Sequence, residues 1–282
     1  MKITTFEAGF FYVDGGAMFG VVPKRVWQKR YPCNDQNMCK LAMRLMLVET
    51  DSRLILMDTG VGEKQLEYLK YYDFTDVFNL EDALKSHGYA MEQVTDVVLT
   101  HLHFDHCGGT TRFVNDQHDI RLTFPNAWVW VGKSQWENFL HPNVREGDSY
   151  FAENMLPVFE SGKLKCVDQS QFIDPNVELK IFNGHTSGQL VPYVYLNDHT
   201  TLVYVGDVIP VAAAIPIAWV SAYDTFPITS MEDKETLLSE AVEKQQILCF
   251  EHDAYIESCR VQKVNGKYRM TENGALMELL KN

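Results

Sequence analysis

The segment 101–106 reads HLHFDH and places three imidazoles and a carboxylate within six residues. In an extended chain alternate side chains point the same way, so His101 and His103 are expected on one side. A turn at Asp105 and His106 would bring two further ligands to an adjacent point. Imidazole and carboxylate groups suit borderline metals such as zinc. Chance gives this pattern in roughly one chain of this composition in two thousand, so it predicts a metal site.

More residues of the same chemistry follow predicted strands. The HLHFDH segment comes directly after the apolar run 94–100, which reads as a buried strand. The others are His185 after the run 177–182, Asp207 after 201–205, and His252 after 247–250. Four strands that each end at a metal-ligating residue favour a functional centre over a solvated polar loop.

The remaining elements are read from periodicity and turn signals. Strands are predicted at 40–48 and 53–57, a helix at 80–87 capped by Asn79, a helix at 230–246 capped by Ser230, and a hairpin turn at 264–267. The uncharged run 208–223 holds two prolines and is predicted to be a loop. Strands interleaved with few helices fit sheet-on-sheet packing with helices outside. Because no linker divides the chain, residues 1–282 are predicted to form one domain.

Composition excludes several classes of protein. Of 282 residues, 46% are hydrophobic and 12% aromatic, which excludes intrinsic disorder. The balance of 25 basic against 38 acidic side chains gives a formal charge of −13, which argues against a nucleic-acid or anionic-membrane partner. The N-terminus lacks the apolar stretch of a signal peptide, and no uncharged run is long enough to span a membrane. A cytoplasmic location with reduced cysteines is therefore expected.

The order of these motifs resembles the metallo-β-lactamase fold superfamily over nearly the whole chain. Asp58-Thr59-Gly60 follows an early strand, and HxHxDH, His185, Asp207 and His252 come in the same order as in that superfamily. The resemblance implies an α+β chain, an αββα four-layer sandwich of two mixed β-sheets with helices on the outer faces. The separations of 22 residues from His185 to Asp207 and 45 from Asp207 to His252 look like those of the N-acyl-homoserine lactonase and methyl parathion hydrolase branch.

The resemblance also implies a ligand set for two divalent metal ions. One ion would be held by His101, His103 and His185; the other by Asp105, His106 and His252; and Asp207 would bridge them. Zinc is the expected metal, with manganese, iron and cobalt as alternatives. Asp58 is expected to orient ligands rather than to bind metal, and Cys107 to pack. Gln189 stands where the branch commonly has a histidine. Gln189 is not expected to bind metal.

The implied activity is metal-dependent hydrolysis. A metal-bridging hydroxide would open a lactone or cleave a related ester, as in quorum-quenching lactonases. Asp105 would pass a proton to the leaving group, and Tyr223 would help to polarise the substrate. The apolar run 208–219 either lines a pocket mouth for a small-molecule substrate with an apolar portion or belongs to the core. A homodimer is expected because dimers are common in that branch.

Other activities share this ligand pattern. Within the same fold they are a phosphotriesterase, a thioesterase of the glyoxalase II kind and a β-lactamase. From another reaction class, a mononuclear iron persulfide dioxygenase also carries HxHxDH. The remaining alternative is a non-catalytic binding protein that keeps the fold. Against it, all seven ligand positions hold a histidine or an aspartate.

Overall fold

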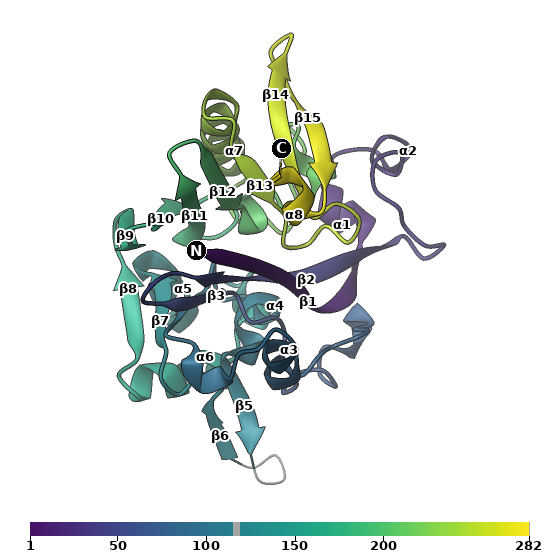
Figure 1. Cartoon of the computed structure of the whole chain (residues 1–282). Coiled ribbons are helices and arrows are strands. Elements are labelled where there is room, and N and C mark those ends of the chain that lie inside the picture. The colour runs from purple at the N-terminus through teal and green to yellow at the C-terminus, as the bar shows by residue number, and fades with distance from the viewer. Residues whose placement is uncertain (115–118, 282) are drawn as a thin grey trace. The chain divides into compact units, whose positions relative to one another are not determined.

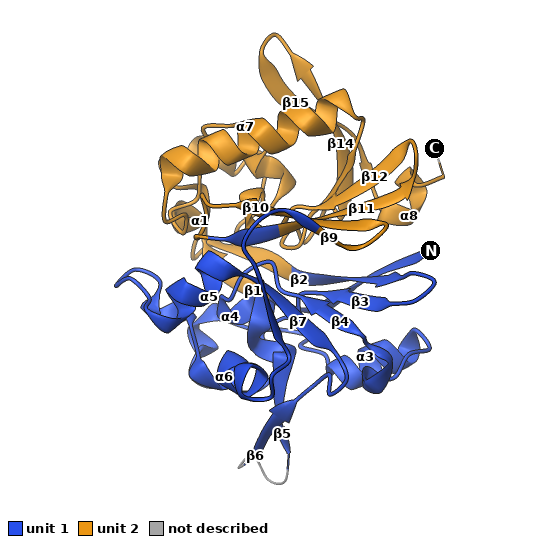
Figure 2. Cartoon of the chain, turned by 90° about the vertical axis from the view of Figure 1, so that its left-hand side faces the viewer, with its two compact units in different colours: residues 1–10, 43–171, 188–190 blue, residues 11–42, 172–187, 191–282 orange. Residues whose placement is uncertain are grey.

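The computed structural model describes residues 1–114 and 119–281. These divide into two compact units, coloured separately in Figure 2. Unit 1 comprises 1–10, 43–171 and 188–190, and unit 2 comprises 11–42, 172–187 and 191–282, of which 282 is not described. The expectation of one domain over residues 1–282 stays a prediction.

Figure 1 labels the main elements. The strands are β1 (Lys2–Asp14), β2 (Met38–Glu49), β3 (Leu54–Met57), β4 (Asp96–Val98), β5 (Thr111–Val114), β6 (Asp119–Leu122), β7 (Trp128–Gly132), β8 (Leu164–Val167), β9 (Gln171–Asp174), β10 (Val177–Phe182), β11 (Gln189–Asn197), β12 (Thr200–Tyr204), β13 (Ile247–Cys249), β14 (Ser258–Val264) and β15 (Lys267–Gly274). The α-helices are α1 (Gly15–Phe19), α2 (Lys24–Trp27), α3 (Leu80–Ser86), α4 (Phe104–Cys107), α5 (Lys133–Leu140), α6 (Ala152–Glu160), α7 (Pro227–Glu243) and α8 (Leu276–Leu279). Within the described ranges, no helix has the length and apolar character needed to cross a membrane.

A mixed sheet forms the centre of unit 1. Its strand order is β1-β2-β3-β4-β7-β8, in which β2 and β3 are antiparallel and the steps from β3 to β4, β7 and β8 are parallel. The parallel strands β3 and β4 are short and buried along their whole length, as expected for strands covered on both faces. Ile55, Leu56, Val97 and Val98 are fully buried, and the register pairs Met57 with Val98. The residues that follow β3 and β4 therefore leave the sheet at the same edge.

Unit 2 repeats this arrangement with a second mixed sheet. The order is β15-β14-β13-β12-β11-β10-β9, with β12 and β13 parallel between antiparallel neighbours. The register pairs Tyr204 with Cys249, so the segments after β12 and β13 also leave at one edge. The two mixed sheets with accompanying helices confirm the predicted α+β class.

Most predicted elements lie within a few residues of the observed ones, but the cap of the long helix was wrong. Asn79 caps α3 by accepting from the backbone N–H groups of Glu81 and Asp82. By contrast, α7 begins at Pro227, three residues before the predicted Ser230 cap. Proline fixes φ near the helical value and needs no N–H partner in the first turn, so it starts the helix without a side-chain cap.

Candidate metal centre

The predicted metal ligands share one local geometry. In each case the first ligand is the third residue after the last residue of its strand: His101 after Val98 of β4, His185 after Phe182 of β10, Asp207 after Tyr204 of β12, and His252 after Cys249 of β13. The last residue of each of these strands is buried, and its packing fixes the start of each three-residue arm. The first ligand of each arm therefore lies close to the packed core of its unit. Four of them belong to unit 1 and three to unit 2.

In unit 1 the imidazoles of the HLHFDH segment lie against one another. Nε2 of His101 is 3.0 Å from Nδ1 of His103, and the His101 and His106 ring centroids are 3.8 Å apart. The carboxylate of Asp105 approaches Nε2 of His106 at 3.6 Å. All four side chains are buried or nearly so. Clustered nitrogen lone pairs and a carboxylate in a buried place are donors that fit a divalent cation.

Asp58 holds this cluster from the end of the neighbouring strand β3. It adopts a left-handed conformation with φ of 56°. Its carboxylate accepts from the backbone N–H and the hydroxyl of Thr100, each at 2.7 Å. Its Oδ2 also lies 3.1 Å from Nδ1 of His106. Asp58 therefore orients a ligand and the backbone beside it, as predicted, and leaves Nε2 of His106 as the donor atom for a metal.

Glu146 is a second acidic partner in unit 1. Its Oε1 lies 3.5 Å from Nε2 of His103, and the side chain is 4% exposed. Hydrogen bonds from Tyr150, Asn138 and Asn143 fix the carboxylate. Sequence reasoning missed this residue, because Glu146 lies 43 positions after His103 and belongs to no recognisable motif.

In unit 2, Asp207 lies between two histidines. Its Oδ2 is 3.3 Å from Nε2 of His185, and its Oδ1 is 3.1 Å from Nε2 of His252. Two imidazole Nε2 atoms that converge on the two oxygens of one carboxylate form the donor arrangement expected of a shared ligand. These clusters of histidine and aspartate in the two units offer the donor groups that a dinuclear metal centre uses.

The second nitrogen of each unit 2 histidine already has a partner. Nδ1 of His185 is 2.9 Å from Oδ1 of Asp224, and Nδ1 of His252 is 2.7 Å from the backbone oxygen of Ala42. An acceptor at Nδ1 holds the proton there, so Nε2 carries the lone pair that binds metal. Sequence reasoning also missed Asp224, which is 39 residues from His185 and directly follows the predicted Tyr223.

Asp224→Asn is expected to weaken metal binding by about 10- to 100-fold, the usual effect of losing an outer partner of a metal-binding histidine. The amide no longer fixes the Nδ1–H tautomer of His185, although the side chain keeps its size. Metal retention in a chelator titration measures the effect, with the exposed Asp198→Asn as the matched control. Equal retention by both variants would show that Asp224 does not position His185.

Two glycines beside the unit 1 ligands are required by close packing. Neither Gly108 nor Gly109 has a positive φ. A Cβ on Gly108 would lie 2.0 Å from the carbonyl oxygen of Val61, and one on Gly109 would lie 2.3 Å from that of Thr59. These contacts bring the chain after Asp58 against the turn that follows His106.

Gly108→Ala is expected to destabilise the protein by about 2–3 kcal/mol, because a rigid backbone carbonyl occupies the space of the added methyl. Gly147→Ala is the matched control, since a methyl group there would meet no atom within 4 Å and the φ of Gly147 is not positive. Denaturant unfolding measures both. A Gly108→Ala variant as stable as Gly147→Ala would contradict the packing argument.

The other predicted residues near the ligands differ in their surroundings. Cys107 is fully buried, its thiol donates to the carbonyl of Leu102, and burial raises its pKa to about 12, so it packs rather than reacts. Tyr223 is 38% exposed on the loop before Asp224, and its catalytic role stays a prediction. The apolar run divides: residues 208–215 are buried, whereas 216–219 are half-buried or exposed.

Several known proteins are similar to this chain. An N-acyl homoserine lactonase of Bacillus thuringiensis is 24% identical over 233 residues, covering 76% of this chain and 83% of the relative. One from Bacillus sp is 26% identical over 153 residues, covering 50% of this chain and 54% of the relative. Thus the chain spans about half the length of one lactonase and most of the other.

Solved structures extend the similarity to the whole fold. A probable metal-dependent hydrolase from Staphylococcus aureus has a TM-score of 0.85 at 27% identity, covering 96% of this chain and 97% of the other. AidC, a dizinc quorum-quenching lactonase, has a TM-score of 0.78 at 20% identity, covering 97% and 95%. The metallo-β-lactamase superfamily model matches residues 45–252. This match includes all seven predicted ligands, so the chain belongs to the metallo-β-lactamase superfamily and is a metallohydrolase.

Proposed function

We propose that this chain hydrolyses a lactone or a related carboxylic ester that carries an apolar portion. The observation that carries the proposal is the ligand geometry within each unit, with Asp207 between two Nε2 atoms and the HLHFDH imidazoles in contact. The similarity to N-acyl homoserine lactonases supports the choice of a lactone. The similarity to a dizinc lactonase supports zinc as the metal.

The seven ligands are proposed to hold two divalent cations, with Asp207 shared between them. Such cations lower the pKa of a bound water and polarise an ester carbonyl. Around them, Asp58 and Asp224 keep the imidazoles in the metal-binding tautomer. Asp105 is proposed to deliver a proton to the leaving oxygen, and the Tyr223 hydroxyl to donate to the substrate carbonyl oxygen.

Metal analysis coupled to a substrate panel tests the proposal. The panel contains an N-acyl homoserine lactone, a phosphotriester, a thioester and a β-lactam, and oxygen consumption is followed with glutathione persulfide. The expected result is about two metal ions per chain and fastest turnover of the lactone. Faster turnover of another compound in the panel would show that the substrate is not a lactone. Oxygen consumption by a chain with one bound iron would show that the reaction is not hydrolysis.

His106→Ala provides the matching variant, because Nε2 of His106 is a proposed ligand. We expect turnover of the preferred substrate to be lost together with about one metal ion. His141→Ala, at an exposed histidine of unit 1, is the control and should behave as the native chain. Full activity of His106→Ala with a single bound metal would overturn the dinuclear assignment.

A further inference from the structure

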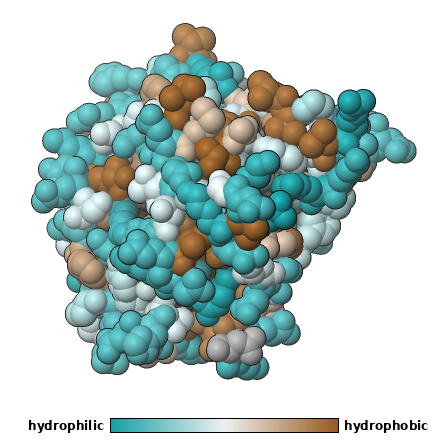
Figure 3. Space-filling model, turned by 90° about the horizontal axis from the view of Figure 1, so that it is seen from above, coloured by the Kyte–Doolittle hydropathy of each residue, from teal (hydrophilic) through white to brown (hydrophobic). Residues whose placement is uncertain are grey.

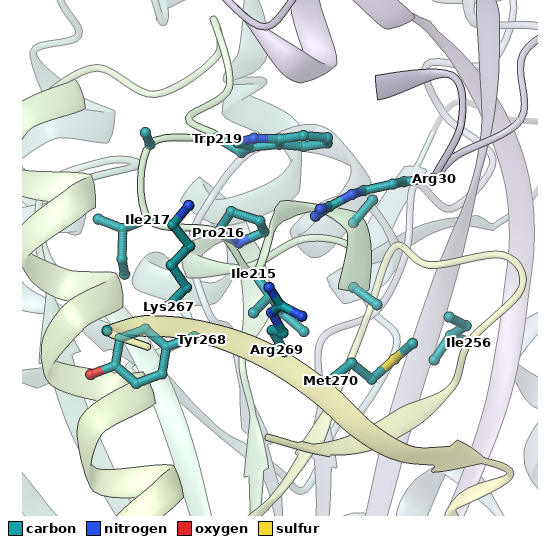
Figure 4. A pocket seen from close by; sticks show the side chains of 14 residues that line it. Arg30, Ile215, Pro216, Ile217, Trp219, Ile256, Lys267, Tyr268, Arg269 and Met270 are labelled. Carbon is teal, nitrogen blue, oxygen red and sulfur yellow. The ribbon is translucent and has the colours of Figure 1, made fainter. Parts of the chain in front are cut away.

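Unit 2 contains a cavity whose lining includes none of the predicted metal ligands. Its volume is about 900 Å³, near the upper end of the roughly 300–1,000 Å³ typical of small-molecule sites. Figure 4 shows it between the segment 215–219 on one side and strand β15 on the other. All its lining residues belong to unit 2.

One wall of this cavity is apolar. This wall consists of Ile215, Pro216, Ile217 and Trp219, which belong to the uncharged run. On the opposite side, Met270 of β15 adds another apolar side chain. Pro216, Ile217 and Trp219 are only half-buried, so part of this apolar surface contacts solvent. The face of the molecule in Figure 3 likewise shows hydrophobic side chains in separate groups among hydrophilic ones. A ligand with an apolar body would remove such a wall from water.

Three cations face the same cavity. Lys267 and Arg269 are two positions apart on β15 and so lie on the same face of the strand. The guanidinium of Arg30 lies 4.6 Å from the ring centroid of Trp219. Figure 4 shows all three side chains reaching into the space beneath Trp219. A chain of charge −13 thus gathers three positive groups around one cavity.

These cations lack acidic partners within residues 1–114 and 119–281. None of the three forms an ion pair there, and no aspartate or glutamate lines the cavity. Elsewhere on the same hairpin the cations are paired, Arg260 with Glu272 and Lys263 with Glu235. Like charges gathered without a counter-ion are unfavourable, and a bound anion relieves their repulsion.

A buried lysine holds the backbone of the apolar wall in place through hydrogen bonds. Nζ of Lys234 on α7 donates to the carbonyl oxygens of Pro216 and Trp219, at 2.9 and 3.0 Å. Another lining residue, Ala212, donates its backbone N–H to the carboxylate of Asp253, the neighbour of His252. The backbone on the apolar side of the cavity is therefore held by buried hydrogen bonds, which favours a preorganised binding site.

We propose that this cavity binds an amphiphilic organic anion, an acid group on an acyl or aryl body. The acid group would lie between Lys267, Arg269 and Arg30, and the apolar body against the wall around Pro216 and Trp219. This site is separate from the metal ligands and does not depend on the hydrolytic reaction proposed above.

Calorimetric titration of the metal-loaded full chain with 1-octanesulfonate tests the proposal, with 1-octanol and inorganic sulfate as partial probes. We expect one octanesulfonate per chain and weaker binding of both partial probes. The variant Lys267→Gln with Arg269→Gln is expected to weaken octanesulfonate binding about tenfold, because it removes two exposed cations of the cavity. The control is Lys29→Gln with Lys281→Gln, two exposed cations outside the cavity.

Three results would overturn the proposal. Absence of octanesulfonate binding would exclude the site. If the cavity and control variants weaken octanesulfonate binding equally, the effect comes from net charge alone. If the cavity variant binds octanesulfonate as the native chain does, the ligand binds elsewhere. Ile217→Asn, at a half-buried wall position, adds a second measurement and is expected to weaken octanesulfonate while leaving sulfate unchanged.

Discussion

Replacing Asp207 by asparagine is expected to reduce hydrolysis about a thousandfold or more and to lower the bound metal from two ions to about one. The carboxylate lies within 3.3 Å of the Nε2 atoms of both His185 and His252. An amide loses the negative charge that two nearby cations require and offers one weaker oxygen donor. Bound metal ions lower the activation free energy of hydrolysis by several kcal/mol. Because each factor of ten in rate corresponds to about 1.4 kcal/mol, losing this contribution gives the expected decrease.

The measurement pairs kcat/KM with metal content after dialysis. Asp198→Asn, in the exposed turn between β11 and β12, is the control and should keep native values of both. Thermal unfolding of the metal-free forms shows whether the variant folds. Native metal content and native turnover in Asp207→Asn would show that Asp207 is not a metal ligand.

The second large effect concerns Lys234 and pH. This side chain is 2% exposed, and burial lowers its pKa to about 7, with Asp224 acting weakly in the opposite direction. In the unfolded chain a lysine keeps a pKa near 10.4. Between about pH 7 and 10 the unfolded state therefore binds more protons than the folded state, and stability rises with pH. From pH 7 to 9 the gain from this group is about 2 kcal/mol.

Lys234→Met isolates this contribution, because methionine fills a similar volume without a titrating group. Urea unfolding at pH 7 and pH 9 gives the change in unfolding free energy for each protein. The native chain is expected to gain about 2 kcal/mol more over this interval than Lys234→Met does. Lys29→Gln, an exposed lysine, should show the native pH dependence. Parallel pH profiles for native and Lys234→Met would show that Lys234 stays protonated in its buried position.

The sequence indicates the candidate ligands, because each one is adjacent in the chain to a predicted strand. Apolar runs identify the buried strands, and the residues that follow them are fixed by the same backbone. Each such ligand therefore lies three residues beyond an observed strand, as at Val98 and His101. The family resemblance added the expected fold and the assignment of ligands to two metals.

What the sequence could not predict depends on contacts between distant segments. Asp224 and Glu146 approach histidines about 40 residues away, and no local pattern distinguishes them from other acidic residues. The role of Gly108 depends on the carbonyl of Val61, 47 positions earlier. The start of α7 was misplaced because Ser230 is a common cap, whereas Pro227 begins the helix without one.

The three-residue arms also restrict how this chain can change in length. An insertion between Tyr204 and Asp207, or in the corresponding arms of the other strands, would displace a ligand from its strand. An insertion after a ligand segment, as between Ile217 and Tyr223, leaves the length of that arm unchanged. Gains and losses of residues during divergence are therefore expected to accumulate after the ligands and to spare the arms before them. Relatives of different length can keep one metal chemistry while the surrounding loops diverge.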